Sequence, residues 1–332
     1  MPLLKANIIR ESFDRYQEDN LYPLAKRDIK LSAATLEDSK DHEYRPKSFY
    51  PKTFWGLTPS IRSQIGGPDG FFLGDLRFQG YFETLFAKNF NLTGSASVGL
   101  VSSLDELKIT SDSIIPHVRT DIVDYLQESE KIGIDRLQFN LFNSHSKNLY
   151  SKISFGLLEE MFGGYGGEFI YRPFDKNYSI GAELWHVKQR DYDMLFKFRD
   201  YETVSGLINI NYHHPESNVL VSIRGGRFLA KDSGISVDFS KVFKTGLRIG
   251  AFAAKTDISK LEFGEGSFDK GFYFFIPVEI FYSSFSKRYI NWGLRPLTRD
   301  GAAYVNHAYF LWGVTEQGQD ISHARNWDGI YD

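Results

Sequence analysis

The sequence predicts an all-β fold, namely an antiparallel β-barrel of the outer-membrane type with about 12 strands. The expected strands are mostly 8 to 13 residues long, whereas strands of soluble domains average about 5 to 6 residues and membrane-crossing strands need about 9 to 11. Charged residues stand inside the strands, and Phe, Tyr and Trp make up 16% of the chain, which fits the polar lumen and aromatic girdles of such barrels. Alternation alone fits a soluble sandwich equally well, so the prediction of a barrel depends mainly on strand length.

The composition narrows the possible functions. The 332 residues carry a formal net charge of -3, which makes nucleic acid a poor candidate as partner. The chain has no Cys, so disulfides, Cys-ligated metals and lipidation of a Cys in these residues are excluded. There is no window of 18 apolar residues, the usual sign of a transmembrane helix. The first residues do not form a signal peptide, so we expect a cytosolic protein, a mature form or a fragment.

Three regions are expected along the chain. Residues 1–65 are a poorly patterned N-terminal segment, interpreted as the tail of an upstream domain, in which 6–16 fit a short helix and 55–64 a first strand. Residues 66–316 form the barrel domain, and 317–332 a C-terminal tail.

The barrel domain begins with a hairpin. Residues 72–86 and 92–101 alternate as strands on either side of a turn at Lys88 and Asn89. Residues 105–133 break this pattern, and the spacing of apolar residues predicts one short helix near 116–127. Residues 134–142 then alternate again.

The centre of the chain, 149–212, predicts four consecutive strands, and the alternation continues beyond it. The central strands are expected at 150–158, 167–174, 178–190 and 201–212. The later strands are expected at 219–224, 235–240, 247–256 and 272–282, followed by a loop at 283–300 and a last strand at 302–315.

Three motifs have residue types found in phosphate- or metal-binding sites. The glycines of Gly163–Gly167 are followed by Glu168 and a strand rather than by a Lys and a helix, so a hairpin bend or strand kink is favoured over a phosphate-binding loop. The adjacent His213 and His214 point to opposite faces of a strand and indicate no metal site. The glycine- and acid-rich loop within 255–271 does not have the spacing of an EF-hand, and we interpret it as a loop at the barrel rim or lumen.

Paired carboxylates are the minimum machinery of a glycosidase. The candidate groups are Glu159 with Glu160, Asp191 with Asp193, and Glu262 with Glu265 and Asp269. We favour a structural or pore-lining role for them, and no catalytic residue, metal or cofactor is predicted.

Six segments, in matching order, resemble a known family. They are GGPDGFFL (66–73), PHVRTDIVDYL (116–126), LLEEMFGGYGGEFIYRPF (157–174), VKQRDYDMLFKFRDYETVSG (187–206), GAFAAKTDISKLEFGEGSFDKGFYFFIP (250–277) and WGLRPLTRDGAAYVN (292–306). The family is the YjbH family, also called GfcD or WbfB, of bacterial exopolysaccharide and capsule proteins. None of these segments carries a known catalytic role.

The resemblance implies a non-enzymatic β-barrel lipoprotein in the outer membrane of a Gram-negative bacterium, which helps polysaccharide reach the cell surface. Family members are about twice as long, so the chain resembles their C-terminal half, with the signal peptide and lipidated cysteine in the other half. The chain departs from the family at Ala302, where a glycine is expected, and at the final Asp332, where barrels commonly end on an aromatic residue. The implied partners are polysaccharide, outer-membrane lipid and other exopolysaccharide or capsule export proteins.

The lumen is expected to be lined by the polar faces of the strands, with Arg136, Gln138, Arg224, Ser236 and Asp238 as members. Trp185, Trp292, Tyr304 and Trp312 are expected to form a girdle or to stack on sugars. The residues predicted to line the lumen or contact glycan are Arg190, Asp191, Asp193, Arg199, Asp200, Arg224, Glu265, Asp269, Arg299 and Asp300. The alternative is a periplasmic β-rich protein that binds or modifies glycan through paired carboxylates.

Overall fold

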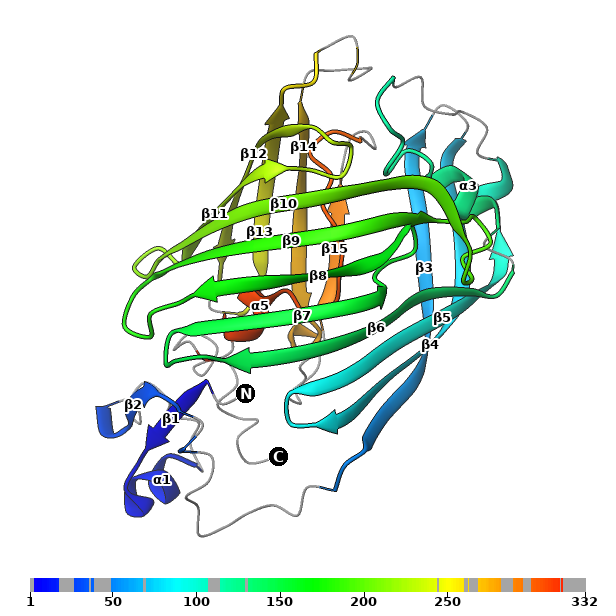
Figure 1. Cartoon of the computed structure of the whole chain (residues 1–332). Helices are drawn as coiled ribbons and strands as arrows, with labels where there is room; N and C mark the ends of the chain where they lie inside the picture. Colours follow the sequence, from blue (N-terminus) through cyan, green and yellow to red (C-terminus); the bar gives the residue numbers. More distant parts are fainter. Residues whose placement is uncertain are drawn as a thin grey trace.

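A computed structural model describes residues 3–17, 27–35, 37–38, 49–67, 70–106, 114–128, 131–243, 245–259, 262, 268–281, 289–294, 300–316 and 318. One antiparallel sheet of 13 strands dominates it, and each strand pairs with its neighbours in sequence (Figure 1). The strands are β3 (Lys52–Gly67), β4 (Gly70–Ala87), β5 (Phe90–Ser102), β6 (Gly133–Ser144), β7 (Leu149–Leu157), β8 (Phe162–Tyr171), β9 (Tyr178–Arg190), β10 (Phe198–His214), β11 (Val219–Arg227), β12 (Ser233–Val242), β13 (Arg248–Thr256), β14 (Asp269–Pro277) and β15 (Tyr289–Leu294).

Smaller elements accompany the sheet. Strands β1 (Leu4–Asn7) and β2 (Lys30–Ala33) form a two-stranded sheet. Together with helix α1 (Arg10–Gln17) it lies below the large sheet in Figure 1. Helix α3 (Ile122–Gln127) follows β5 and the short 3-10 turn η1 (Leu104–Glu106), and η2 (Val278–Ile280) follows β14. Helix α5 (Leu311–Glu316) lies inside the curve of the large sheet. The part of the chain that the structure describes contains no helix long and apolar enough to cross a membrane.

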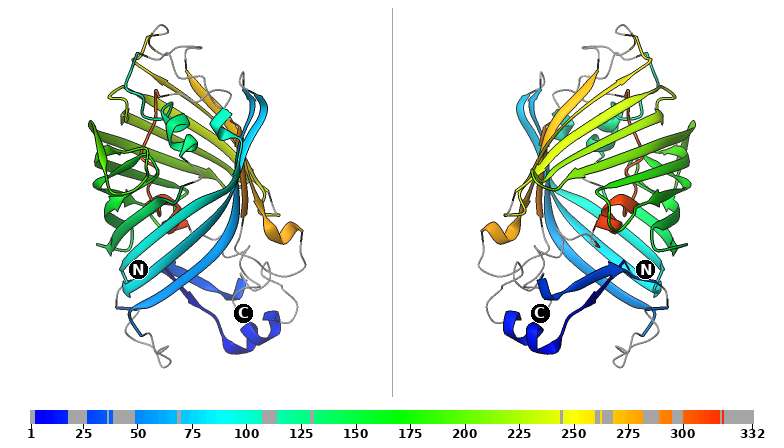
Figure 2. Two further views of the ribbon diagram at one scale, coloured as in Figure 1. Left: turned by 90° about the vertical axis from the view of Figure 1, so that its right-hand side faces the viewer. Right: turned by 90° about the vertical axis from the view of Figure 1, so that its left-hand side faces the viewer.

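The sheet is strongly curved, but within the described residues its two edges do not join into a closed barrel. The side views show both edge strands, β3 and β15, on the same side of the molecule (Figure 2), yet no ladder joins them in the described ranges. In an up-and-down sheet of 13 strands the first and last strands run parallel, so an antiparallel ladder cannot join β3 to β15. The all-β antiparallel prediction is thus confirmed, whereas a closed barrel of about 12 strands is not what these residues form.

Most strands lie where the sequence predicts them, and two expectations are wrong. β9 has the predicted bounds, and β4 and β5 form the hairpin expected across Lys88 and Asn89. Residues 302–315 are not a strand: they run as irregular chain into α5. The edge strand is β15, which lies inside the predicted loop 283–300. The first strand expected at 55–64 is confirmed by β3, which pairs with β4, so the sheet begins before residue 66, where the barrel domain was expected to start.

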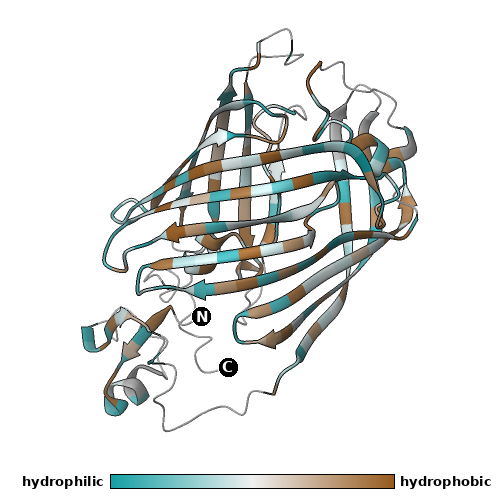
Figure 3. Cartoon of the chain, viewed as in Figure 1, coloured by the Kyte–Doolittle hydropathy of each residue, from teal (hydrophilic) through white to brown (hydrophobic). Residues whose placement is uncertain are grey.

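The two faces of the sheet have opposite character. In β7, Ile153 and Phe155 are 55% and 50% exposed, while Lys152 and Ser154, which alternate with them, are fully buried. The exposed fractions show the same alternation in neighbouring strands, with large apolar residues on the convex surface and charged residues on the concave side. Figure 3 shows hydrophobic and hydrophilic residues following one another along these strands. Convex examples are Phe169, Leu184, Ile208, Ile210, Ile223, Ile235, Val237 and Phe239. We call this exposed surface the apolar convex face.

A small apolar core fills one end of the concave side. It is built where α3 and the connections at 158–162 and 229–230 meet. Its members are Val118, Tyr125, Leu158, Met161, Phe162, Trp185, Val187, Met194, Leu229, Ala230, Ala303 and Val305. The helix predicted near 116–127 is confirmed over Ile122–Gln127, while 116–121 form irregular chain, bends and turns. Tyr125 of this helix is part of the core.

The Gly163–Gly167 run lies inside β8 and not in a hairpin bend. Gly166 faces the concave side beneath Trp185, and a Cβ there would lie 2.3 Å from the Leu184 carbonyl oxygen and 2.4 Å from the indole ring. Glycine is needed because backbone and indole approach so closely.

Replacing Gly166 with alanine is expected to lower the free energy of unfolding by about 1–3 kcal/mol, because the overpacked carbonyl cannot move without disturbing the ladder. The matched control is Gly293→Ala, where the nearest atoms to a Cβ lie 3.5 Å away. Urea unfolding followed by tryptophan fluorescence measures both variants, and equal stabilities would contradict the packing argument.

Candidate functional site

The segment Asp300–Glu316, here called the inner segment, runs through the concave side of the sheet (Figures 1 and 2). Side chains from β6 to β11 bind both the backbone and the side chains of the inner segment. Arg136 donates to the Asn306 carbonyl, Gln138 accepts from the Ala308 amide, and Glu168 accepts from the Leu311 amide. The inner segment is thus bound by side chains of the sheet rather than by a strand ladder, which explains why its alternating sequence does not form a strand.

A buried ion cluster anchors the middle of this segment. Lys152 of β7 places its Nζ 2.7 Å from a Glu168 carboxylate oxygen and 2.8 Å from His307 Nδ1, and donates to the carbonyls of Ala308 and Tyr309 at 2.9 Å. The His307 ring stacks on Trp185 with centroids 4.3 Å apart.

The same cluster includes a second carboxylate and resembles a metal site in composition. Glu183 accepts a hydrogen bond from Trp185 Nε1 at 3.0 Å and lies 3.4 Å from His307 Nε2. Glu168, Glu183 and His307 offer ligand atoms within 4.8 Å of one another. The Lys152 ammonium lies beside Glu168 and His307, where a metal ion would otherwise be expected. The arrangement is therefore an ion-paired network in which lysine supplies the positive charge.

Arginines hold the two ends of the inner segment. The Arg224 guanidinium lies 4.0 Å from the centre of the Tyr304 ring. Arg172 donates to the Trp312 carbonyl at 3.0 Å and to Thr315 Oγ1 at 3.2 Å. At the start of the segment, Asp300 accepts from the amides of Arg119 and Thr120 and from the Thr120 hydroxyl.

The turn between β11 and β12 also contacts the inner segment. Asp232 accepts a hydrogen bond from the Ala302 amide at 2.8 Å. Burial raises the pKa of this carboxyl, and the amide bond opposes that effect.

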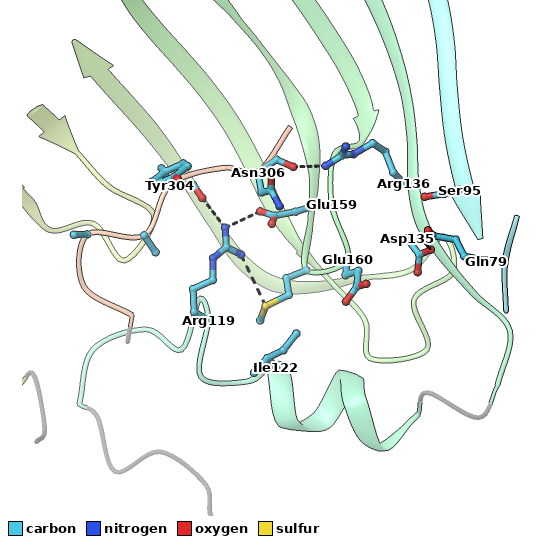
Figure 4. Close-up of a pocket in the computed structure, with 13 residues that line it drawn as sticks. Gln79, Ser95, Arg119, Ile122, Asp135, Arg136, Glu159, Glu160, Tyr304 and Asn306 are labelled. Carbon is cyan, nitrogen blue, oxygen red and sulfur yellow. Dashed lines mark hydrogen bonds and ion pairs between the residues drawn. The ribbon is translucent and has the colours of Figure 1, made fainter. Parts of the chain in front are cut away.

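A polar cavity of about 660 Å³ lies between the inner segment, α3 and the strands β4 to β6 (Figure 4). Arg119 and Arg136 reach the inner segment from two sides, the first bonded to the Tyr304 carbonyl at 2.6 Å and the second to that of Asn306 at 2.6 Å. The lining residues are Gln79, Ser95, Arg119, Ile122, Asp135, Arg136, Glu159, Glu160, Met161, Ala302, Ala303, Tyr304 and Asn306.

Each carboxylate in this lining has an arginine partner. Glu159 pairs with Arg119 at 2.9 Å, Glu160 with Arg62 at 3.2 Å, and Asp135 with Arg77 at 3.3 Å. Asp135 also accepts from Ser97 at 2.6 Å and from Gln79 at 2.8 Å. Glu159 and Glu160, weighed as a catalytic pair from the sequence, thus belong to two different ion pairs.

The predicted site residues do not gather in one place. Arg224 contacts Tyr304 of the inner segment, and Asp300 is the first residue of that segment. Arg190 is buried and donates to the carbonyls of Glu159, Met194 and Leu195, so it holds the loop after β9 in place.

The remaining predicted site residues are spread over strand ends. Asp191 and Asp193 cap the turn after β9 rather than sharing a strand face: they accept from the amides of Tyr192 and Leu195. Arg199 lies over the Tyr192 ring at 4.1 Å, and Asp200 is exposed at the start of β10. Asp269 is buried at the start of β14, while Glu265 and Arg299 lie outside the described residues.

The residues expected to line the lumen lie on the concave face. Gln138 is fully buried there, Arg136 contacts the inner segment, and Asp238 accepts from the Tyr273 hydroxyl at 2.7 Å. Three of the four residues expected to form an aromatic girdle lie elsewhere. Trp185 is 1% exposed and faces inward, and Tyr304 and Trp312 belong to the inner segment. Among those four only Trp292, 46% exposed on β15, lies on the surface.

Sequence reasoning missed the anchoring cluster. Lys152, Glu168 and Glu183 occupy concave positions of three adjacent strands, and their charge within alternating strands was a usable signal. His307 carried no such signal, because it lay in what was expected to be the last strand.

A family model and a curated relative indicate the same family. A family model described as YjbH, Exopolysaccharide biosynthesis protein YbjH, matches residues 1–317. The uncharacterized lipoprotein YjbH of Escherichia coli (strain K12) is 34% identical over 268 residues, which is 78% of this chain and 38% of that protein. The chain therefore spans well under half the length of this curated relative. Among solved structures, Salmonella typhi OmpF in complex with daunomycin matches with a TM-score of 0.38 and 12% identity, over 77% of this chain and 95% of that one.

Proposed function

The chain belongs to the YjbH family of exopolysaccharide biosynthesis proteins, and we propose that it is a non-enzymatic part of an outer-membrane protein that takes part in exopolysaccharide or capsule biosynthesis and export. In this proposal the curled sheet is part of the wall of a β-barrel. Lipid covers its convex face, and its concave face meets polysaccharide. Other export proteins of the envelope are its expected partners.

The observation that carries the proposal is the reversed distribution of side chains. Ile153, Phe155 and Leu184 are half-exposed or more on the convex face, while Lys152, Glu168 and Glu183 are buried on the concave one. A soluble protein of this size buries its apolar face. A membrane barrel exposes an apolar band to lipid and keeps polar groups inside. The relative's description as a lipoprotein of a Gram-negative bacterium supports a place in the cell envelope.

The arginine partners of the cavity carboxylates support a binding role rather than catalysis. Asp135, Glu159 and Glu160 are each ion-paired, which favours fixed contacts. The alternative of a periplasmic glycan-modifying enzyme needs a carboxylate pair with separate acid and base roles, and the geometry of these three offers a weaker basis for it.

Outer-membrane fractionation of the full-length parent protein tests the proposal. We expect the protein in the outer-membrane fraction, with gel mobility that changes on heating because a folded barrel resists detergent. Deletion of its gene is expected to lower surface polysaccharide. A soluble periplasmic protein without a heat-dependent shift would contradict the membrane part of the proposal, and unchanged surface polysaccharide would contradict the export part.

A further inference from the structure

We propose that the polar cavity beside the inner segment binds a short stretch of uncharged saccharide. The inference rests on the proposed function, which brings polysaccharide to the concave face, and it specifies the place and the chemical class of the glycan.

The cavity has the size and access of a ligand site. Its volume of about 660 Å³ lies within the range of roughly 300–1,000 Å³ usual for small-molecule sites. At one end the side chains of Glu160 and Arg62 are 26% and 21% exposed. On the inner segment Asn306 is exposed, whereas Val305 and His307 on either side are buried. Asn306 is therefore the exposed residue among those that the inner segment contributes to the lining, beside Ala302, Ala303 and Tyr304.

The lining offers hydrogen-bond donors and acceptors that are already held in place. Arg136 is fixed by the carbonyls of Leu158 and Asn306 at 2.7 and 2.6 Å, bonds that use two of its five N–H groups. Asp135 is fixed by Ser97 and Gln79. Sugar hydroxyls both donate and accept, so a wall that mixes guanidinium, amide and carboxylate groups suits them. Fixed groups also lose little side-chain entropy on binding.

The charge of the cavity decides between neutral and acidic glycans. Its lining has three carboxylates (Asp135, Glu159 and Glu160) against two arginines, Arg119 and Arg136. Two further arginines, Arg62 and Arg77, lie behind this wall and pair with those carboxylates. Arg119 is paired with Glu159, and Arg136 is held by two carbonyls in a lining that has three carboxylates. These residues direct no excess of positive charge into the cavity, so a uronate or phosphate group would meet no surplus of cations there. An uncharged saccharide has no such requirement.

The test measures binding of known oligosaccharides to the purified full-length protein by saturation-transfer NMR. The protein is kept in a zwitterionic detergent, because detergents with sugar head groups would compete. The probes are pentasaccharides of glucose and of galactose, with pentagalacturonate as the acidic probe, all at millimolar concentration. Ser95→Tyr fills the cavity from a residue whose side chain shows no hydrogen bond in the structure, and Asn306→Leu removes the side-chain amide. Matched controls are Ser236→Tyr, on the concave face of β12, and Asn291→Leu, exposed on β15.

We expect at least one neutral probe to bind the wild-type protein and both controls. Binding should be lost in Ser95→Tyr and weakened about five-fold in Asn306→Leu, the effect of losing one ordinary hydrogen bond. The inference is overturned if no neutral probe binds, if the acidic probe binds more tightly, or if Ser95→Tyr binds like its control. These results are independent of membrane fractionation, so an outer-membrane protein that binds none of the probes would refute this site while leaving the proposed function intact.

Discussion

Replacing Lys152 with methionine is expected to lower the free energy of unfolding by about 3–5 kcal/mol and to loosen the inner segment. The ammonium is fully buried and contacts Glu168, His307 and two carbonyls of the inner segment. Removing one partner of a buried ion pair leaves the other charge uncompensated, which costs about this amount. The loss should appear both in urea unfolding and as faster proteolytic cleavage within the inner segment.

Two further variants separate charge from shape. Lys255→Met, at an exposed position of β13, is the matched control and should change stability by less than about 0.5 kcal/mol. Adding Glu168→Gln to Lys152→Met should restore part of the loss, because the carboxylate left without its ammonium is then neutral. If Lys152→Met unfolds like the Lys255 variant, the cluster does not anchor the inner segment.

The second large effect concerns the apolar convex face. Val237 is 40% exposed in the middle of β12 (Ser233–Val242), and Val221 lies on the same face of β11. If this face contacts lipid, an arginine at either position should cost about 2–4 kcal/mol at mid-bilayer depth. We therefore expect Val237→Arg and Val221→Arg to lower the amount of heat-modifiable protein in the outer membrane several-fold.

The matched control places the same charge on the other face. Ser222 lies on the concave side of β11, directly opposite Asp238 on β12, so Ser222→Arg gains an acidic neighbour and should assemble normally. Normal assembly of both valine variants would show that the convex face does not contact lipid. Failure of Ser222→Arg as well would point to a general sensitivity of these strands to arginine.

The sequence was informative about strands because their signal is local. β9 and the β4–β5 hairpin were predicted correctly, since alternation and turn residues at Lys88 and Asn89 act over a few neighbours. The inner segment was misassigned for the same reason. Ala303 and Val305 are buried and Asn306 is exposed, a pattern like that of a strand. What distinguishes it from a strand is its set of partners, Arg136, Gln138 and Glu168, more than 140 residues away.

The candidate site shows the same limit. Arg224 and Asp300 were identified because charge in or beside an alternating strand is visible in the sequence. Glu159 pairs with Arg119, and Glu160 pairs with Arg62. These pairings depend on how β3, α3 and the β7–β8 turn meet in space. Periodicity carries no information about which side chains meet across the fold, so the partners of these two neighbouring carboxylates could be identified only from the structure.

The long sequence separation between Lys152 and His307 has a consequence for the order of folding. The inner segment follows every strand of the sheet, and the hydrogen bond between these two residues closes a loop of 155 residues. Loop closure over such distances is slow, and chains rich in distant contacts fold slowly. Until residues 300–316 arrive, Lys152 lacks its contacts with His307 and with the carbonyls of Ala308 and Tyr309, and Glu168 lacks the Leu311 amide. We therefore expect chains truncated before Asp300 to remain loosely packed.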